Sequence, residues 1–199
     1  DSINTSDGND QITAGGGDDS ITGGTGSDTF IIEYESGAAD VISDFDATDD
    51  NEKIDLSDSN ITEVIGTQSG SDVVLTINGD HTLTLSNVTL SDLDANDFTM
   101  GSAAFSVTDT GGSAFVISGS GNDSIDAGKN DSDHIVTNSG NDTVTQIDDD
   151  NTVELGAGND LLDNIWGSSQ HNDIQGGAGN DTLDVSAGSG AQTLDGGAD

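Results

Sequence analysis

Single large apolar residues recur every nine positions at the start of the chain. Ile3, Ile12, Ile21 and Phe30 stand nine apart, and each follows a polar residue. A short triplet with one apolar residue at its centre does not have the spacing of an amphipathic helix. It is typical of a brief strand that buries one side chain. The spacing therefore predicts three-residue strands, separated by six-residue turns, over residues 1–31.

The same spacing returns in the second half of the chain. There the apolar position is filled by Ile125, Ile135, Val144, Val153, Leu162, Ile174, Leu183 and Leu194. Self-similarity at a fixed short period is the signature of a repeat architecture, in which each unit buries its apolar residue only by stacking on its neighbours. We expect a second run of the repeat over residues 101–199.

Residues 32–100 abandon this period. Val73, Leu75 and Ile77 alternate with polar residues, and the following Asn-Gly pair and the segment "HTLTL" predict a β-hairpin. The stretch from Ser91 to Phe98 predicts one helical turn with Ser91 as its N-cap. The sequence thus divides into 1–31, 32–100 and 101–199.

Aspartate and glycine occupy fixed places ahead of the apolar residue. The recurring aspartates are Asp1, Asp10, Asp19, Asp28, Asp123, Asp133, Asp142, Asp160 and Asp181. The turn glycines are Gly8, Gly15, Gly17, Gly24, Gly26, Gly119, Gly121, Gly140, Gly156, Gly158, Gly177 and Gly179. Glycine lets backbone carbonyl oxygens approach an ion, and aspartate reaches an ion from its own loop. Oxygen ligands on loops are those that calcium prefers.

The charge balance limits the classes of molecule that the chain can bind. The 199 residues carry 39 acidic side chains against two lysines and no arginine, for a net charge of -37, and only five of the acids are Glu. Two lysines cannot neutralise nucleic-acid phosphates or an anionic membrane surface, and no apolar run is long enough to span a membrane. The absence of cysteine excludes disulfides and thiolate metal sites. A disordered acidic tail is disfavoured by the regular apolar spacing.

The repeat unit resembles the RTX (repeats-in-toxin) nonapeptide G-G-x-G-x-D-x-U-x, where U is a large apolar residue. "GGTGSDTFI" (23–31) fits at every position and "AGGGDDSIT" (14–22) fits with Ala14 first. The resemblance implies an all-β fold, a parallel β-roll in which two units make one coil. It also implies several calcium ions between stacked turns, held by the aspartates and glycine-loop carbonyls above.

The words "ISDF", "KIDLS" and "VTLSDL…DF" within 32–100 resemble the cap that follows β-rolls in serralysin-type proteases and alginate epimerase modules. That resemblance implies a further calcium site at Asp40 and Asp44, with Asp55 as another candidate, and Glu52 stands where the family has Asp. A cap covers the unpaired strand edges at the end of a roll. The resemblance gives a first roll at 1–31, a cap at 32–100 and a second roll at 101–199.

Successive turns of a roll alternate between its two edges, and the second roll is predicted to be lopsided. One edge receives four turns that all end in Gly-Asn-Asp, "SGSGND", "TNSGND", "LGAGND" and "GGAGND". The divergent edge has insertions within 127–133, 164–172 and 185–192, while 146–151 keeps standard length. Its ligand position reads Ala114, Asp133, Asn151, Asn172 and Gln192. We expect a full calcium ladder on the regular edge and the loss of most ions on the other.

The divergent edge also holds Lys129, His134, Trp166 and His171. Two explanations stay open, drift on an edge without ligands and a recognition surface around Trp166. His81, His134 and His171 stand in unlike contexts without zinc-ligand spacing, and no nucleophile–base–orienter set is visible, so an enzyme is not expected.

The leading functional hypothesis is a calcium-dependent structural module of a large secreted or surface-attached bacterial protein, of adhesin or S-layer type. It would be disordered without calcium and fold on export by type I secretion. The alternative is a non-catalytic, calcium-dependent polysaccharide-binding module of a secreted enzyme such as an alginate epimerase. Beyond calcium, the expected partners are other copies of the chain or cell-surface polysaccharide. Because Asp1 already fills a ligand position and "GGAD" begins another turn, we expect an excerpt of a longer protein.

Overall fold

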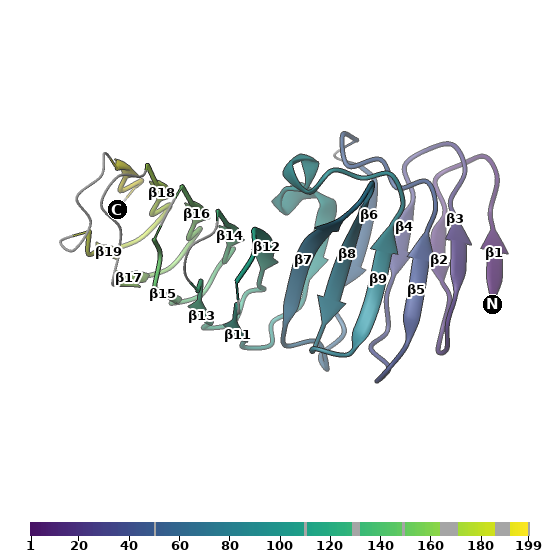
Figure 1. Cartoon of the computed structure of the whole chain (residues 1–199), viewed down its shortest axis with the longest axis horizontal. Coiled ribbons are helices and arrows are strands. Elements are labelled where there is room, and N and C mark those ends of the chain that lie inside the picture. Colours follow the sequence, from purple (N-terminus) through teal and green to yellow (C-terminus); the bar gives the residue numbers. More distant parts are fainter. Residues whose placement is uncertain are drawn as a thin grey trace. The chain divides into compact units, whose positions relative to one another are not determined.

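The computed structural model describes residues 1–49, 51–109, 111–128, 132–148, 150–163, 171–185 and 192–198. The chain forms two compact units, Asp1–Gly101 and Ser102–Asp199. The regular secondary structure of the described segments is almost entirely β-strand, with two short 3-10 helices and no α-helix. Strands stacked in parallel into a solenoid confirm the expected all-β fold (Figure 1).

Each repeat at the start of unit 1 forms one three-residue strand. These strands are β1 (Ser2–Asn4), β2 (Gln11–Thr13), β3 (Ser20–Thr22) and β4 (Thr29–Ile31). β1 pairs in parallel with β3, with Ile3 opposite Ile21, whereas β2 pairs with β4, with Ile12 opposite Phe30. Consecutive strands therefore belong to opposite sheets, and two repeats make one coil.

The rest of unit 1 continues both sheets. Its strands are β5 (Ala39–Ile42), β6 (Lys53–Leu56), β7 (Val64–Ser69), β8 (Asp72–Ile77), β9 (His81–Leu85) and β10 (Phe98–Met100). β5 and β6 add in parallel to β3 and β4, and β10 adds in parallel to β6. β9 runs parallel to β5, but β8 is antiparallel to both β9 and β7. Within unit 1 the strand orders are β1-β3-β5-β9-β8-β7 and β10-β6-β4-β2.

The predicted hairpin is present, and the predicted helical turn is different. Between β8 and β9, Asn78 and Gly79 take the positive φ values of 49° and 78° that such a turn requires. The expectation of one turn capped by Ser91 is wrong. Ser91 lies inside a 3-10 helix, η1 (Leu90–Asp92), and a second, η2 (Ala95–Asp97), is capped by Asp94. The Asp94 carboxylate accepts the Asn96 N–H, and Asp97 accepts the Asp94 N–H, so a capping box starts the helix three residues later.

The described part of unit 2 is a roll that contains ten short strands. They are β11 (Ser106–Thr108), β12 (Ala114–Ile117), β13 (Ser124–Asp126), β14 (His134–Val136), β15 (Thr143–Thr145), β16 (Thr152–Glu154), β17 (Leu161–Asp163), β18 (Asp173–Gln175), β19 (Thr182–Leu183) and β20 (Thr193–Asp195). The even-numbered strands stack into one sheet and the odd-numbered strands into the other, all in parallel (Figure 1).

Most strands of the rolls bury the side chain at their centre, whereas β12 buries all four of its residues. In unit 2 the register stacks Ile125 on Val144 and Val144 on Leu162, and all three are essentially inaccessible to solvent. The facing sheet contributes Ile135, Val153 and Ile174, which are equally buried. Because this apolar core is narrow, contacts between the loops at the two edges contribute much of the stability that keeps the coils stacked.

Candidate metal centre

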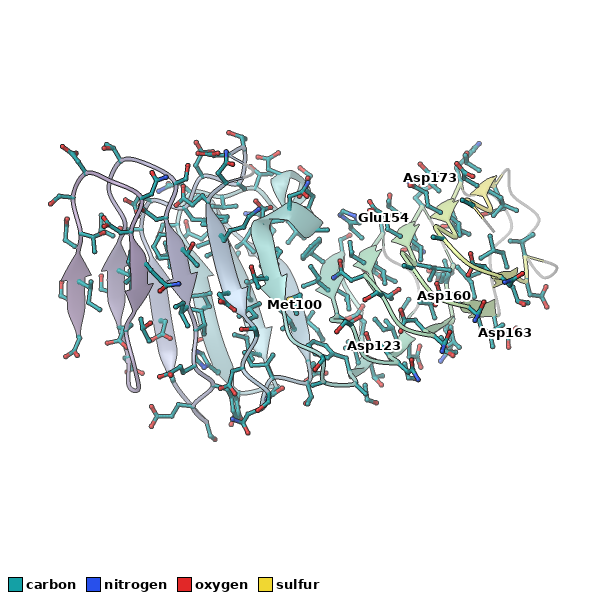
Figure 2. The ribbon with its side chains drawn as sticks, turned by 180° about the vertical axis from the view of Figure 1, so that it is seen from behind. Met100, Asp123, Glu154, Asp160, Asp163 and Asp173 are labelled. Carbon is teal, nitrogen blue, oxygen red and sulfur yellow. The ribbon has the colours of Figure 1, made fainter. Side chains whose placement is uncertain are left out.

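The aspartates of the regular edge form a column along the roll. Asp123, Asp142, Asp160 and Asp181 directly precede β13, β15, β17 and β19, which pair in register. Asp123 and Asp160 are labelled in Figure 2 on this side of unit 2, whereas Glu154 and Asp173 belong to strands of the other sheet. The first three members of the column are at most 3% exposed.

One oxygen of each carboxylate ties its coil to the preceding coil. Asp142 Oδ1 accepts the N–H of Asp123 at 2.8 Å, and Asp160 Oδ1 accepts the N–H of Asp142 at 2.8 Å. Asp181 Oδ1 accepts the N–H of Asp160 at 3.0 Å. The aspartate therefore has a structural task that involves only one of its oxygens.

The second oxygen of these carboxylates is buried and has no hydrogen-bond partner within the described structure. This holds for Oδ2 of Asp10 and Asp19 in unit 1 and of Asp123, Asp142, Asp160 and Asp181 in unit 2. A buried ionised oxygen without a partner is costly. Burial, together with the charges of Asp123 and Asp160, raises the pKa of Asp142 to about 6, and burial also raises the pKa of Asp160. A column of orphaned anionic oxygens suits a column of bound cations.

Backbone carbonyls converge on the same places. A Cβ added to Gly158 would lie 1.4 Å from the carbonyl oxygen of Gly140 and 3.1 Å from Asp160 Oδ1. At both Gly140 and Gly158, a carbonyl oxygen of the preceding coil thus lies close to Oδ1 of the aspartate that ends the loop. This mixture of carboxylate and carbonyl oxygens is the donor set that calcium accepts, so the residues present fit the ion.

Most of the turn glycines singled out in the repeat have a positive φ. Positive φ is found at Gly8, Gly15, Gly17, Gly24, Gly26, Gly140, Gly156, Gly158, Gly177 and Gly179. Gly119 and Gly121 stand apart, because neither is among the residues with positive φ. Gly121 is instead required by packing, since its Cβ would meet the Ala103 carbonyl oxygen at 2.5 Å.

Unit 1 contains two shorter columns, and one includes a residue that the sequence analysis left out of the ligand set. Glu52 directly precedes β6 as Asp28 precedes β4, and Lys53 pairs with Thr29. Glu52 is 5% exposed, and burial raises its pKa to about 7, with the charges of Asp28 and Asp44 acting in the same direction. The sequence signal was its place two residues before the inward-facing Ile54.

The other column of unit 1 runs from Asp1 through Asp19 to Asp40. Asp40 Oδ1 accepts the Asp19 N–H at 3.0 Å, as in the regular ladder. Its Oδ2 lies 2.9 Å from Nε2 of the buried His81. Because His81 Nδ1 accepts the Glu35 N–H, Nε2 carries the hydrogen that is donated to Asp40. No sequence pattern links His81 to Asp40.

Asp44 lies at the glycine loop of the preceding coil. Its Oδ1 and Oδ2 accept the N–H groups of Gly23 and Gly24 at 3.0 and 2.8 Å. Together with Glu52 and Asp28 it forms an electrostatically coupled acidic group, because their charges raise the pKa of Glu52. The predicted pair Asp40 and Asp44 is thus divided between a histidine contact and a backbone contact, and the role of each as a ligand stays a prediction.

An asparagine ladder explains the recurring Gly-Asn-Asp, for which the sequence analysis offered no reason. Asn122 Oδ1 accepts the N–H of Asn141, Asn141 Oδ1 accepts that of Asn159, and Asn159 Oδ1 accepts that of Asn180, at 2.8 to 2.9 Å. Each asparagine bonds to the following coil, whereas the adjacent aspartate bonds to the preceding one. Two neighbouring residues therefore clamp a coil from both sides.

On the divergent edge the column continues with amides in place of carboxylates. Asp133 is followed in register by Asn151, Asn172 and Gln192, each directly before its strand. His134 lies 3.3 Å from Glu154, and the exposed His171 donates its N–H to Asp150. Lys129, Trp166 and the surface predicted around Trp166 lie outside the described residues.

Within the described ranges, no group of three or more His, Cys, Asp or Glu side chains is placed to hold a metal ion. The other oxygen atoms that lie near these carboxylates are carbonyl oxygens of the stacked loops. No helix in the described part of the chain is long and apolar enough to cross a membrane.

Comparison with known families agrees with this geometry. The model of the RTX calcium-binding nonapeptide repeat matches residues 1–30 and, in overlapping segments, 108–144, 128–162, 147–183 and 163–190, which is more than half of the chain. The chain belongs to the RTX calcium-binding nonapeptide repeat family. A search of curated proteins found no match. This RTX chain is accordingly a calcium-binding structural module built of family repeats.

We expect the calcium-free RTX chain to gain β-structure as the pH falls from 8 to 5. The folded-state pKa values of Glu52 and Asp142, about 7 and about 6, lie above the ordinary values of 4.5 and 3.8. Folding therefore takes up protons, and the stability that these groups confer at low pH is lost as the pH rises through 6 and 7. Far-UV circular dichroism in chelator at pH 5 and pH 8 measures the difference. The double variant Glu52→Gln, Asp142→Asn should reduce it, and an identical pH response of this variant would contradict the assignment.

Proposed function

We propose that this RTX chain is a non-catalytic, calcium-dependent structural module of a large secreted or surface-attached bacterial protein of adhesin or S-layer type. The observation that carries the proposal is the column of buried, unpartnered Oδ2 atoms repeated along the coils. The proposed ligands are the carboxylates of Asp1, Asp10, Asp19, Asp28, Asp40, Asp44, Asp123, Asp133, Asp142, Asp160 and Asp181, with Glu52 added, and carbonyls of the glycine loops.

Each type of residue in the repeat has its own part in this design. When bound, calcium supplies two positive charges between adjacent coils. The aspartate holds the preceding coil through Oδ1 and offers Oδ2 to the ion, and glycine lets the loop carbonyl approach. Without the ion, the folded chain would carry rows of buried carboxylates within a net charge of -37. Calcium binding and folding are therefore coupled.

The coupling of folding to calcium binding is compatible with export of the chain from the cell. In a low-calcium cytosol the chain would stay unfolded and compatible with type I secretion, and it would fold outside the cell, where calcium is abundant. Two stacked-coil units provide length and regular side-chain columns without a catalytic centre, as a filament or lattice component requires. Exposed carboxylates would let calcium bridge neighbouring copies of the chain.

The alternative is a polysaccharide-binding module of a secreted enzyme. An anionic polymer would be repelled by this surface unless calcium or a lysine bridged the two. Lys53, one of the two lysines, donates through Nζ to the carbonyl of Asn96. The adhesin or S-layer hypothesis is therefore favoured. Retention on an alginate column in calcium, absent in chelator, would instead support the alternative.

The test of the proposed function is a calorimetric calcium titration of the whole chain, followed in parallel by circular dichroism. Several ions are expected to bind, and β-structure is expected to appear over the same calcium range. Magnesium, which prefers octahedral sites with retained water, should not substitute. The absence of calcium binding, or binding with no change in structure, would contradict the proposal.

A further inference from the structure

The two edges of unit 2 provide an internal comparison, because the column position carries carboxylates on the regular edge and, after Asp133, amides on the divergent edge. Asn151 Oδ1 accepts the N–H of Asp133 at 2.6 Å, and Asn172 Oδ1 accepts the N–H of Asn151 at 2.7 Å. On the regular edge, Asp160 Oδ1 accepts the N–H of Asp142 in the same way. The bond that ties one coil to the preceding coil is therefore preserved when aspartate is replaced by asparagine.

The edges differ at the second side-chain atom. Asp160 Oδ2 is buried and has no hydrogen-bond partner in the described structure. Asn172 Nδ2 occupies the corresponding branch and donates to the carbonyl oxygen of Asp148 at 3.0 Å. Asn172 is 1% exposed, so this contact is shielded from water. Where the regular edge has an orphaned acceptor, the divergent edge has a donor already bonded to a loop carbonyl.

A loop carbonyl is the kind of ligand that would otherwise face a cation. An amide N–H satisfies such a carbonyl with no net charge, and it leaves no anionic oxygen to neutralise. A buried carboxylate at the same position would be costly without a positive partner. The neutral Asn172 amide therefore satisfies the loop carbonyl by itself. On the regular edge, the same position needs both a carboxylate and a bound ion.

We infer that the Asn172 side chain replaces a calcium ion, so that the coils joined by Asn151 and Asn172 are clamped on the divergent edge without metal. This inference rests on the proposed function and adds to it. The coils joined by Asn151 and Asn172 therefore depend on calcium at the regular edge alone. The divergent edge holds a latent calcium site, which a single change from amide to carboxylate should open.

The experiment is a reciprocal exchange in the whole chain, comparing Asn172→Asp and Asp160→Asn with the unmodified protein. Calorimetric stoichiometry should rise by one calcium ion in Asn172→Asp and fall in Asp160→Asn. The calcium concentration at the midpoint of folding should rise in Asn172→Asp, because a buried carboxylate now requires neutralisation. Both variants keep the oxygen that accepts the N–H of the preceding coil, so each serves as the structural control of the other.

The outcomes separate the inference from the proposed function. Unmodified protein that binds no calcium would refute the proposed function itself. Unmodified protein that binds several ions, with an unchanged count in Asn172→Asp, would overturn the inference alone. If Asn172→Asp does not fold in calcium, the ion count of Asn172→Ala provides the test. An unchanged ion count in Asn172→Ala supports replacement of the ion by the amide. The loss of one ion refutes it.

Discussion

Transfer of the chain into a calcium chelator at pH 7.5 is expected to abolish most of its β-structure. Six described aspartates have a buried Oδ2 without a hydrogen-bond partner, and neighbouring members of each column are joined only through backbone N–H groups. In the rolls, most strands supply one or two buried apolar side chains, which offset little of the conformational entropy of the loops. Far-UV circular dichroism should therefore report coil, and the radius of gyration should approach the value of about 48 Å for an unfolded chain of this length.

A salt control separates site-specific calcium binding from general charge repulsion. In about 1 M NaCl the Debye length is about 3 Å, so repulsion among exposed carboxylates is largely screened. If screening alone restored β-structure in chelator, the buried oxygens would not be the cause of calcium dependence. We expect calcium to restore structure at millimolar concentration or below, whereas sodium does not. Complete β-structure in chelator at low salt would contradict the calcium requirement.

The fold could be predicted from the sequence because each strand has one obligatory inward position. A residue such as Val144 has no alternative place in a three-residue strand, so the nine-residue spacing locates both strands and turns. The insertions on the divergent edge do not disturb this spacing, since Val153 still pairs in register with Ile174.

The site could be predicted only in part, because side-chain partners are set by stacking and not by local spacing. His81 and Asp40 are 41 positions apart and meet only when β9 adds beside β5. The asparagine column was visible as a motif, but its direction depends on which coil each amide reaches. Glu52 falls outside the predicted ligand set because it is not an aspartate, although it has the same offset from Ile54 as the ligand aspartates have from their apolar residues.

The amides of the divergent edge show the limit of reasoning from residue type. Replacement of Asp by Asn was interpreted as the loss of a ligand, which considers charge alone. The structure shows that Asn172 retains the hydrogen bond to the preceding coil and gains one to the Asp148 carbonyl. In unit 2 a column position therefore has two separable tasks, bonding to the preceding coil and satisfying the second side-chain atom, and Asn172 performs both as a neutral amide.

Substitution of one loop glycine is expected to be as damaging as loss of a column of ions. Gly156 has φ of +85°, and a Cβ there would lie 1.8 Å from the carbonyl oxygen of Asn138 in the preceding coil. That oxygen accepts the N–H of Ala157, so it cannot move away without breaking the stacking of the loops. Gly156→Ala should therefore destabilise the calcium-bound protein by more than about 3 kcal/mol, the sum of backbone strain and a clash that cannot relax.

Gly112→Ala is the matched control. Gly112 belongs to the same unit and has φ of +104°, but a Cβ there meets no atom of the described residues within 4 Å. It should show only the cost of a left-handed residue, about 1–2 kcal/mol. Urea unfolding in saturating calcium gives both values, and the calcium midpoint for folding should rise more for Gly156→Ala. Equal losses in the two variants would mean that backbone conformation alone, and not the close approach of stacked loops, explains why glycine recurs in the repeat.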